Sequence, residues 1–140
     1  MFKVARKFTF SIAHILDNHD GKCKNLHGHN YKLLVEISGD LIKNGAKEGM
    51  VIDFADLKTI VKREILDQLD HSFIYNQNSI NETKIAKLLE ELNSKTFALD
   101  GRTTAENIAK IIYQKLKSYF NISKVKLWET DSSYCEYSEN

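Results

Sequence analysis

Residues Phe2–His14 read FKVARKFTFSIAH, and this stretch does most to set the fold. Apolar and polar side chains alternate along it with a period of two, which predicts a β-strand buried on one face. The apolar positions are Phe2, Val4, Phe8, Phe10 and Ile12. His14 falls on the same parity. We therefore expect its imidazole to extend the inward face of the strand.

A second strand is predicted from about His29 to Ser38. Its inward positions are Tyr31, Leu33, Val35 and Ile37. His27 and His29 share the parity of Tyr31, and side chains two residues apart in a strand point the same way. Gly28 between them permits unusual backbone angles or a close approach between the two histidines. If both strands extend this far, three imidazoles converge on one inward face.

Three neutral imidazoles suit Zn²⁺ and leave its fourth tetrahedral position open for water or substrate. Cys23 lies four residues before His27 and leaves two alternatives. As a fourth ligand it would complete a closed structural site. As a nucleophile or base it would stand beside an open catalytic site. The spacing does not decide between them.

Composition narrows the class of protein. The 140 residues carry a formal net charge of +1, with 42% apolar and 28% charged side chains. These values fit one globular domain over residues 1–140 and give no reason to expect a nucleic-acid or membrane partner. No apolar run approaches the roughly 18 residues of a membrane helix, and no signal peptide is recognisable. The two cysteines, Cys23 and Cys135, indicate reduced thiols in a cytoplasmic protein.

The order of elements predicts an α+β fold. We expect an antiparallel four-stranded sheet with two main helices on one face, in the order ββααββ. Asp53 is the expected N-cap of the first main helix. The other expected elements are main helices over Phe54–Leu69 and Ala105–Phe120, a shorter helix over Thr83–Leu92, a short extended piece over Thr96–Leu99, and closing strands over Lys124–Thr130 and Ser133–Tyr137.

Three further sites leave their roles open. Glu129 shares the apolar parity of its strand, so it either anchors a ligand with two N–H donors or reaches water at a strand end. Asp70 and His71 form either a proton-transfer pair or an ordinary helix end. Thr103 and Glu106 fit a capping box, with Thr103 as the cap, and this explanation needs no function.

The motifs together resemble the 6-pyruvoyltetrahydropterin synthase family, over nearly the whole chain from Phe8 to Thr130. The resemblance rests most on Cys-x-x-x-His-Gly-His-Asn-Tyr, which starts at Cys23. The other motifs, each weaker but in the right order, are Phe10-Ser-Ile-Ala-His14, Gly49-Met-Val-Ile-Asp53-Phe54, Leu69-Asp70-His71, Thr104-Ala-Glu106-Asn107 and Trp128-Glu129-Thr130.

The resemblance implies a tunnelling fold (T-fold) and a homohexamer, a dimer of trimers with active sites between subunits. It implies Zn²⁺ as the cofactor and a pterin triphosphate, 7,8-dihydroneopterin triphosphate, as the substrate. It also implies a role for each site residue. These are metal binding by His14, His27 and His29, catalysis by Cys23, Asp70 and His71, and substrate binding by Glu129, Thr104 and Glu106.

The short gap between Cys23 and His27 favours the branch of the family that cleaves a carbon–carbon bond and leaves a 6-carboxy pterin for queuosine biosynthesis. Two alternatives stay open. One is the pyruvoyl-forming branch, with the same fold and another product. The other is a zinc-stabilised module without activity, in which Cys23 closes the site. One departure from the family pattern is Thr103, which stands where a proline is usual.

Overall fold

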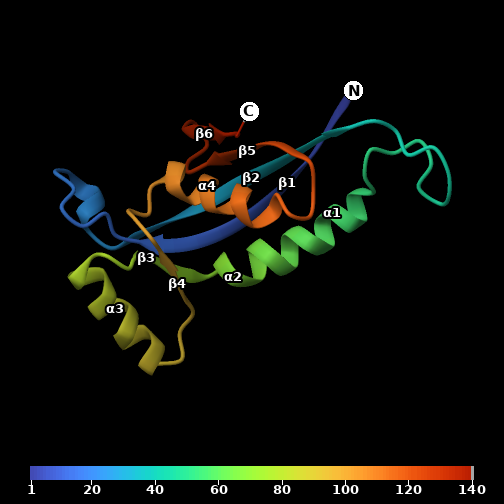
Figure 1. Cartoon of the computed structure of the whole chain (residues 1–140). Helices are drawn as coiled ribbons and strands as arrows, with labels where there is room; N and C mark the ends of the chain where they lie inside the picture. The colour runs from blue at the N-terminus through green and yellow to red at the C-terminus, as the bar shows by residue number, and fades with distance from the viewer. Residues whose placement is uncertain (140) are drawn as a thin grey trace.

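The computed structural model of the chain describes residues 1–139, which form one curved six-stranded sheet with helices packed on it (Figure 1). In spatial order the strands are β4-β3-β1-β2-β5-β6. The elements in chain order are β1 (Phe2–His14), a 3₁₀ turn (Lys22–Lys24), β2 (His27–Gly39), α1 (Phe54–Val61), a π-helical segment (Lys62–Leu66), α2 (Asp67–Leu69), β3 (Ser72–Asn76), α3 (Ile80–Glu91), β4 (Thr96–Leu99), α4 (Ala105–Leu116), β5 (Ile122–Trp128) and β6 (Tyr134–Tyr137).

The hairpin of β1 and β2 is the long central pair of the sheet. The two strands are antiparallel, and His14 lies opposite His27 while Ile12 lies opposite His29. Burial alternates along both strands, as the sequence predicts. The second strand begins at His27, so it includes both histidines that follow Cys23. The register therefore places all three imidazoles at one end of the hairpin.

The prediction of a four-stranded antiparallel sheet is wrong in strand number and direction. β5 pairs with β2 and β6 with β5, both antiparallel, as expected. In addition, β3 runs parallel to β1, and β4 runs parallel to β3. The sheet is therefore mixed. The predicted order ββααββ gains two short strands, β3 after α2 and β4 after α3.

The strand β3 escaped prediction because it is short and lacks alternation. Its first three residues, Ser72, Phe73 and Ile74, are all buried, so burial does not alternate between its two faces. The sequence also predicts a helix end at the residues just before it. β4 coincides with the short extended piece expected over Thr96–Leu99.

Two main helices cover one face of the sheet, as predicted. The first runs without a break from α1 through the π-helical segment to α2, and the second is α4. Their apolar stripes and the inward side chains of the sheet form one buried core. Its members include Phe8, Phe10, Tyr31, Leu33, Val35, Leu57, Val61, Ile65, Ile108, Ile112, Leu116, Val125 and Leu127.

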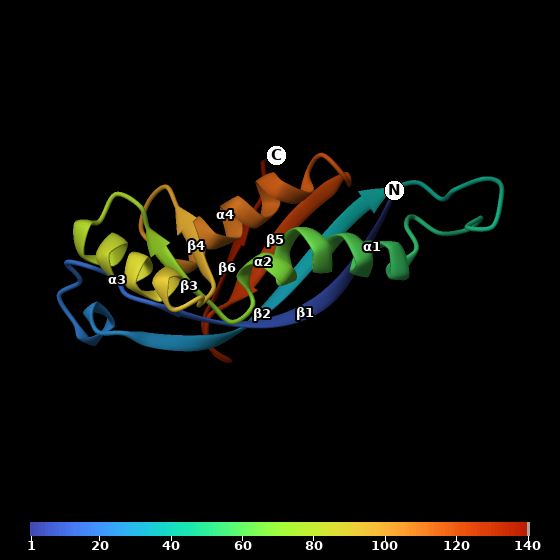
Figure 2. The same ribbon diagram turned by 90° about the horizontal axis from the view of Figure 1, so that it is seen from below.

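The third helix, α3, packs against β3 and β4 at the edge of the sheet (Figure 2). At the far end, the connection between β2 and α1 extends away from the body of the molecule. No helix among residues 1–139 is long and apolar enough to cross a membrane.

Helix capping agrees with the prediction at one site and corrects it at another. The Asp53 carboxylate accepts a hydrogen bond from the Ala55 N–H, which makes Asp53 the N-cap of α1. At α4 the cap is Thr104, whose hydroxyl accepts from the Asn107 N–H, and not Thr103 as predicted. The capping box is displaced because Thr104, with φ −71° and ψ 157°, is the last extended residue before the helix.

Candidate metal centre

His14, His27 and His29 converge at one end of the central hairpin. Each can offer one ring nitrogen such that the three nitrogens lie within 4.8 Å of one another. The ring centroids are 4.5 Å apart for His14 and His27, 5.2 Å for His14 and His29, and 5.0 Å for His27 and His29. The strand parity therefore produces the cluster that the sequence predicts.

The Nδ1 atoms of two of these histidines are hydrogen-bonded to backbone carbonyl oxygens. His14 Nδ1 lies 2.9 Å from the Thr103 carbonyl oxygen, and His27 Nδ1 lies 2.7 Å from the Asn25 carbonyl oxygen. A carbonyl oxygen only accepts, so each Nδ1 must carry the proton and donate it. In the neutral imidazole, Nε2 then keeps a free lone pair, which is the state a metal ligand needs.

The three Nε2 atoms are buried, and none has a hydrogen-bond partner within residues 1–139. A buried polar atom without a partner is rare in proteins and calls for a physical reason. A divalent ion bound between the three lone pairs would satisfy all of them at once. On this test the residues fit a metal of the Zn²⁺ type, with an open fourth position.

Burial also favours the neutral form of two of the three imidazoles. It lowers the pKa of His14 from 6.5 to about 4, with smaller contributions from the two neighbouring imidazoles. Burial lowers the pKa of His29 as well, against the opposing effect of the Glu129 carboxylate. Both rings are therefore unprotonated near pH 7 and able to bind a cation.

Gly28 is required by the close approach of the two strands. A Cβ atom at this position would lie 2.6 Å from the carbonyl oxygen of Ile12 in β1. Any larger residue at this position would push β1 and β2 apart next to His27 and His29. The sequence predicts a close approach between the two histidines, but the close approach at Gly28 is to the backbone of the neighbouring strand.

Cys23 lies in the 3₁₀ turn before β2 and is half-buried with a free thiol. Its sulfur does not belong to the group of potential ligand atoms that the three histidines form. This placement favours the open site over the closed four-ligand site.

Glu129 joins the metal centre to a neighbouring pocket. Its Oε1 lies 3.7 Å from His29 Nε2, and its Oε2 accepts a hydrogen bond from the Tyr31 hydroxyl at 3.4 Å. The pocket has a volume of about 220 Å³. It is lined by Leu16, Thr104, Ala105, Glu106, Glu129, Ser133 and Tyr134. The structure therefore brings together the three residues predicted to bind substrate.

Asp70 and His71 form a separate pair between α2 and β3. His71 Nδ1 lies 3.0 Å from Asp70 Oδ1, and the same oxygen accepts from the Ser11 N–H at 2.9 Å. Burial opposes ionisation of Asp70, but these two partners and Lys95 lower the pKa of its carboxyl on balance. Asp70 is therefore anionic beside the imidazole.

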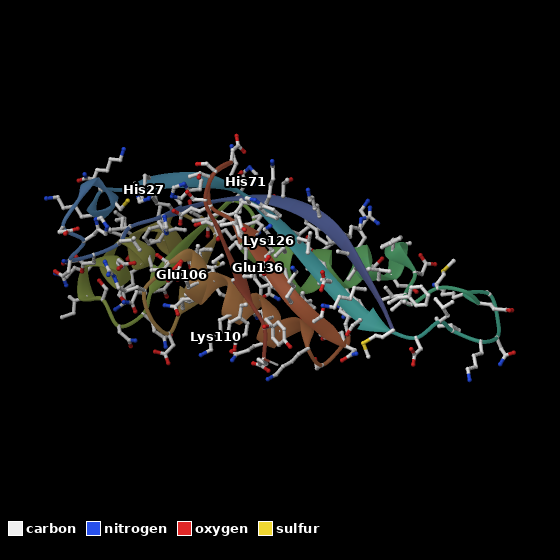
Figure 3. The ribbon with its side chains drawn as sticks, turned by 90° about the horizontal axis from the view of Figure 1, so that it is seen from above. His27, His71, Glu106, Lys110, Lys126 and Glu136 are labelled. Atoms are coloured by element: carbon white, nitrogen blue, oxygen red, sulfur yellow. The ribbon has the colours of Figure 1, made fainter. Side chains whose placement is uncertain are left out.

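His71 is 83% exposed and has a left-handed φ of +61°, a conformation that histidine adopts more readily than most residues. No hydrogen bond or ion pair found within residues 1–139 joins it to the three metal-site histidines or to Cys23. In Figure 3, His27 lies at the start of β2, Glu106 on the first turn of α4, and His71 on the segment that leads into β3. Within the described residues, the Asp70–His71 pair is therefore bonded to Ser11 of β1 and makes no hydrogen bond or ion pair with the metal centre.

Three contributors to the site were not predicted. Thr103 and Asn25 act through backbone carbonyls, which leave no signal in the side-chain pattern. The Tyr31 hydroxyl could have been recognised, because Tyr31 shares the inward parity of His29. A buried tyrosine hydroxyl needs a partner, and a carboxylate on the neighbouring strand was available.

Fold and site define a class: an α+β T-fold protein whose hairpin carries a three-histidine metal centre beside a carboxylate pocket. The model of the family "6-pyruvoyl tetrahydropterin synthase" matches residues 3–140. The chain belongs to this family.

Its curated relatives include the 6-carboxy-5,6,7,8-tetrahydropterin synthase of Haemophilus influenzae, 60% identical over 99% of this chain and 100% of the relative. The protein of the same name in Rickettsia bellii is 34% identical over 97% of this chain and 99% of its own length. Each aligns over nearly its full length, so the similarity covers the whole chain.

Solved structures agree with this fold. An uncharacterized protein, WS1659 of Wolinella succinogenes, superposes with a TM-score of 0.82 at 23% identity, covering 99% of this chain and 98% of its own. The 6-pyruvoyl tetrahydropterin synthase of Caenorhabditis elegans gives a TM-score of 0.71 at 28% identity, covering 99% of this chain and 96% of its own.

Proposed function

We propose that this chain is a 6-carboxy-5,6,7,8-tetrahydropterin synthase that uses Zn²⁺. It would convert 7,8-dihydroneopterin triphosphate and one water molecule into 6-carboxytetrahydropterin, acetaldehyde and triphosphate for queuosine biosynthesis. The observation that carries the proposal is the set of three buried, unpartnered Nε2 atoms beside the Glu129 pocket. The relative of the same name at 60% identity supports the choice of branch.

His14, His27 and His29 would hold the metal through Nε2. When bound, Zn²⁺ supplies Lewis-acid chemistry that polarises oxygens on the substrate side chain and acidifies the adjacent C–H. The carbonyl oxygens on the Nδ1 atoms of His14 and His27 keep these two rings oriented toward the ion.

Glu129 would orient the pterin. A carboxylate accepts two parallel N–H bonds, and a pterin offers such a pair along one edge. The hydroxyl of Tyr31 holds one carboxylate oxygen, while Thr104 and Glu106 line the opposite part of the pocket. Anchoring the ring here places its side chain toward the histidines, because Glu129 lies 3.7 Å from His29.

Cys23, Asp70 and His71 would carry the proton transfers. Cys23 as thiolate takes the proton from the acidified carbon, and His71 moves a proton between substrate positions. The Asp70 carboxylate orients the imidazole and stabilises its charged form at 3.0 Å. Because this pair makes no hydrogen bond or ion pair with the histidines within residues 1–139 of one chain, we expect a neighbouring subunit of the hexamer to supply it.

The pyruvoyl-forming synthase remains the second candidate, since the C. elegans protein of that name shares the fold at 28% identity. Both candidates use the same metal site. The closed structural site is disfavoured because Cys23 is outside the ligand group.

The test is mass spectrometry of the products after the zinc-loaded protein has been incubated with 7,8-dihydroneopterin triphosphate. A 6-carboxy pterin together with acetaldehyde supports the proposal. A pyruvoyl pterin without acetaldehyde moves the chain to the other branch. No turnover by a folded, zinc-loaded sample would contradict both enzymatic candidates for this substrate.

A further inference from the structure

Thr103 links two parts of the site that the chain supplies from distant segments. It is completely buried, and it directly precedes Thr104, the N-cap of α4. Its carbonyl oxygen lies 2.9 Å from His14 Nδ1. A backbone carbonyl alone would suffice to accept this proton, so the presence of a buried hydroxyl at the same place needs a separate explanation.

The Thr103 hydroxyl has two neighbours. Its oxygen lies 3.2 Å from His14 Nδ1 and 3.5 Å from the carbonyl oxygen of Ile15. The carbonyl of Ile15 only accepts, so the hydroxyl proton must point toward it. With its proton toward Ile15, the hydroxyl oxygen offers its lone pairs to His14, which fits the proton on Nδ1 that the Thr103 carbonyl requires.

The opposite tautomer is excluded by the same contacts. With the proton on Nε2, the Nδ1 lone pair would face the lone pairs of the Thr103 carbonyl oxygen at 2.9 Å. The Nε2–H would also point into a buried space where no acceptor for it is found within residues 1–139. The carbonyl thus selects the tautomer that leaves Nε2 free, and the hydroxyl oxygen is placed to accept from the same Nδ1–H.

We propose that Thr103 is a positioning residue of the metal centre: its hydroxyl, together with its carbonyl, fixes the tautomer and orientation of His14 and so raises the metal affinity. This deepens the proposed function, on which it rests for the use of the metal. It assigns a task to the residue that departs from the family pattern, since a proline at this position would have no hydroxyl.

Thr103 also connects the metal centre to the substrate pocket. The Asn107 side chain donates to the Arg102 carbonyl at 2.9 Å, which holds the segment before Thr103 on the first turn of α4. The pocket residues Thr104 and Glu106 follow immediately. A displacement of His14 would therefore be transmitted to the pocket through a short stretch of backbone.

Two variants separate the hydroxyl from the rest of the residue. Thr103→Val keeps the carbonyl and the shape of the side chain but removes the hydroxyl, while Thr103→Ser keeps the hydroxyl and loses one methyl group. We expect Thr103→Val to weaken Zn²⁺ binding about 10-fold, the lower end of the usual range for partners of metal ligands, and Thr103→Ser to stay within about 3-fold of the parent chain. The measurement is competition for Zn²⁺ with a chromophoric chelator.

A second measurement needs no variant. In the metal-free parent chain, nitrogen-15 NMR of the histidine side chains should place the proton of His14 on Nδ1. A proton on Nε2, or equal Zn²⁺ affinity in the Val and parent chains, would overturn the proposal. Both measurements omit the substrate. An intact Thr103 effect in a protein without turnover would therefore refute the proposed function and leave this inference standing.

Discussion

A histidine can bind a metal through either ring nitrogen, and the partner of the other nitrogen decides which one is free. In this chain the carbonyl oxygens of Thr103 and Asn25 accept hydrogen bonds from Nδ1 of His14 and His27, which leaves Nε2 free in both rings. The strand pattern predicts which residues point inward but says nothing of their tautomers. At the scale of residues, the convergence of the three histidines could be predicted from the sequence, whereas the atoms that orient their rings could not.

Replacing one ligand should remove the metal and spare the fold. We expect His27→Ala to lose the Zn²⁺ that the parent chain binds at about one per chain, because two imidazoles make a much weaker site. Metal analysis after dialysis measures the loss, and far-ultraviolet circular dichroism checks the fold. His19→Ala is the matched control, since His19 lies outside the cluster. Metal retained by His27→Ala would refute the site.

Glu129→Gln should impair substrate binding more than metal binding. The amide keeps the shape but loses the charge that strengthens bonds from N–H donors, so we expect KM to rise on the order of 10- to 100-fold. Steady-state kinetics measure KM, and chelator competition should give a smaller change in Zn²⁺ affinity, which reflects the loss of a charge 3.7 Å from His29 Nε2. Glu136→Gln changes an exposed carboxylate of β6 that pairs with Lys124, and it serves as the control. An unchanged KM in Glu129→Gln would argue against the anchor.

The metal-free protein should lose stability in mild acid. The pKa of His14 is about 4 in the folded chain and 6.5 when exposed, so the unfolded chain binds more protons between these values. Stability therefore rises with pH across this window and is lost as the pH falls from about 6.5 to about 4. The loss from His14 is about 3 kcal/mol at most. Urea unfolding at several pH values measures it, and a His14→Gln variant with the same slope would contradict the assignment.

At the scale of elements, the alternation of side chains predicted β1 and β2 closely, because each long strand has one buried face. The same criterion missed β3, whose first three residues are all buried. It also misplaced the cap of α4 by one residue, since two adjacent threonines are equally good caps and only backbone conformation separates them. Short segments and termini are decided by tertiary contacts that local patterns do not contain.

Gly28→Ala should damage the hairpin and the metal site together. The added Cβ would lie 2.6 Å from a backbone oxygen of β1, which cannot move without the strand. We expect a loss of about 2 kcal/mol in the free energy of unfolding and at least a 10-fold weaker affinity for Zn²⁺.

Thermal unfolding and chelator competition measure these two effects. Gly39→Ala is the control in the same strand, because its Cβ would meet only a Val51 methyl group at 3.3 Å. Comparable behaviour of the two variants would show that the close approach is unimportant.

At the scale of the whole molecule, the chain presents a metal centre and an Asp70–His71 pair that share no hydrogen bond or ion pair within residues 1–139 of one copy. The sequence resemblance anticipates this division, because it implies active sites between subunits. No pattern within a single chain could have predicted it, since periodicity and parity describe only what one copy folds into.

Mixing two inactive variants should restore activity if the site is shared. We expect Cys23→Ala and His71→Ala each to be nearly inactive, and mixed oligomers refolded from both to regain a fraction of the parent rate. In such mixtures some sites receive an intact Cys23 from one subunit and an intact His71 from its neighbour. Activity of mixed and separate samples is compared at equal protein concentration. Mixed samples as inactive as the separate variants would place both residues in one subunit.

During synthesis on the ribosome, the residues of this metal centre are made in a fixed order. All three ligands emerge within the first 29 residues, before any of the main helices, whereas Thr103 is made much later. A nascent hairpin could therefore meet a metal ion early, but His14 would still lack its buried acceptor. The full affinity of the centre arises only when the segment that starts α4 has been made and has folded back onto the hairpin.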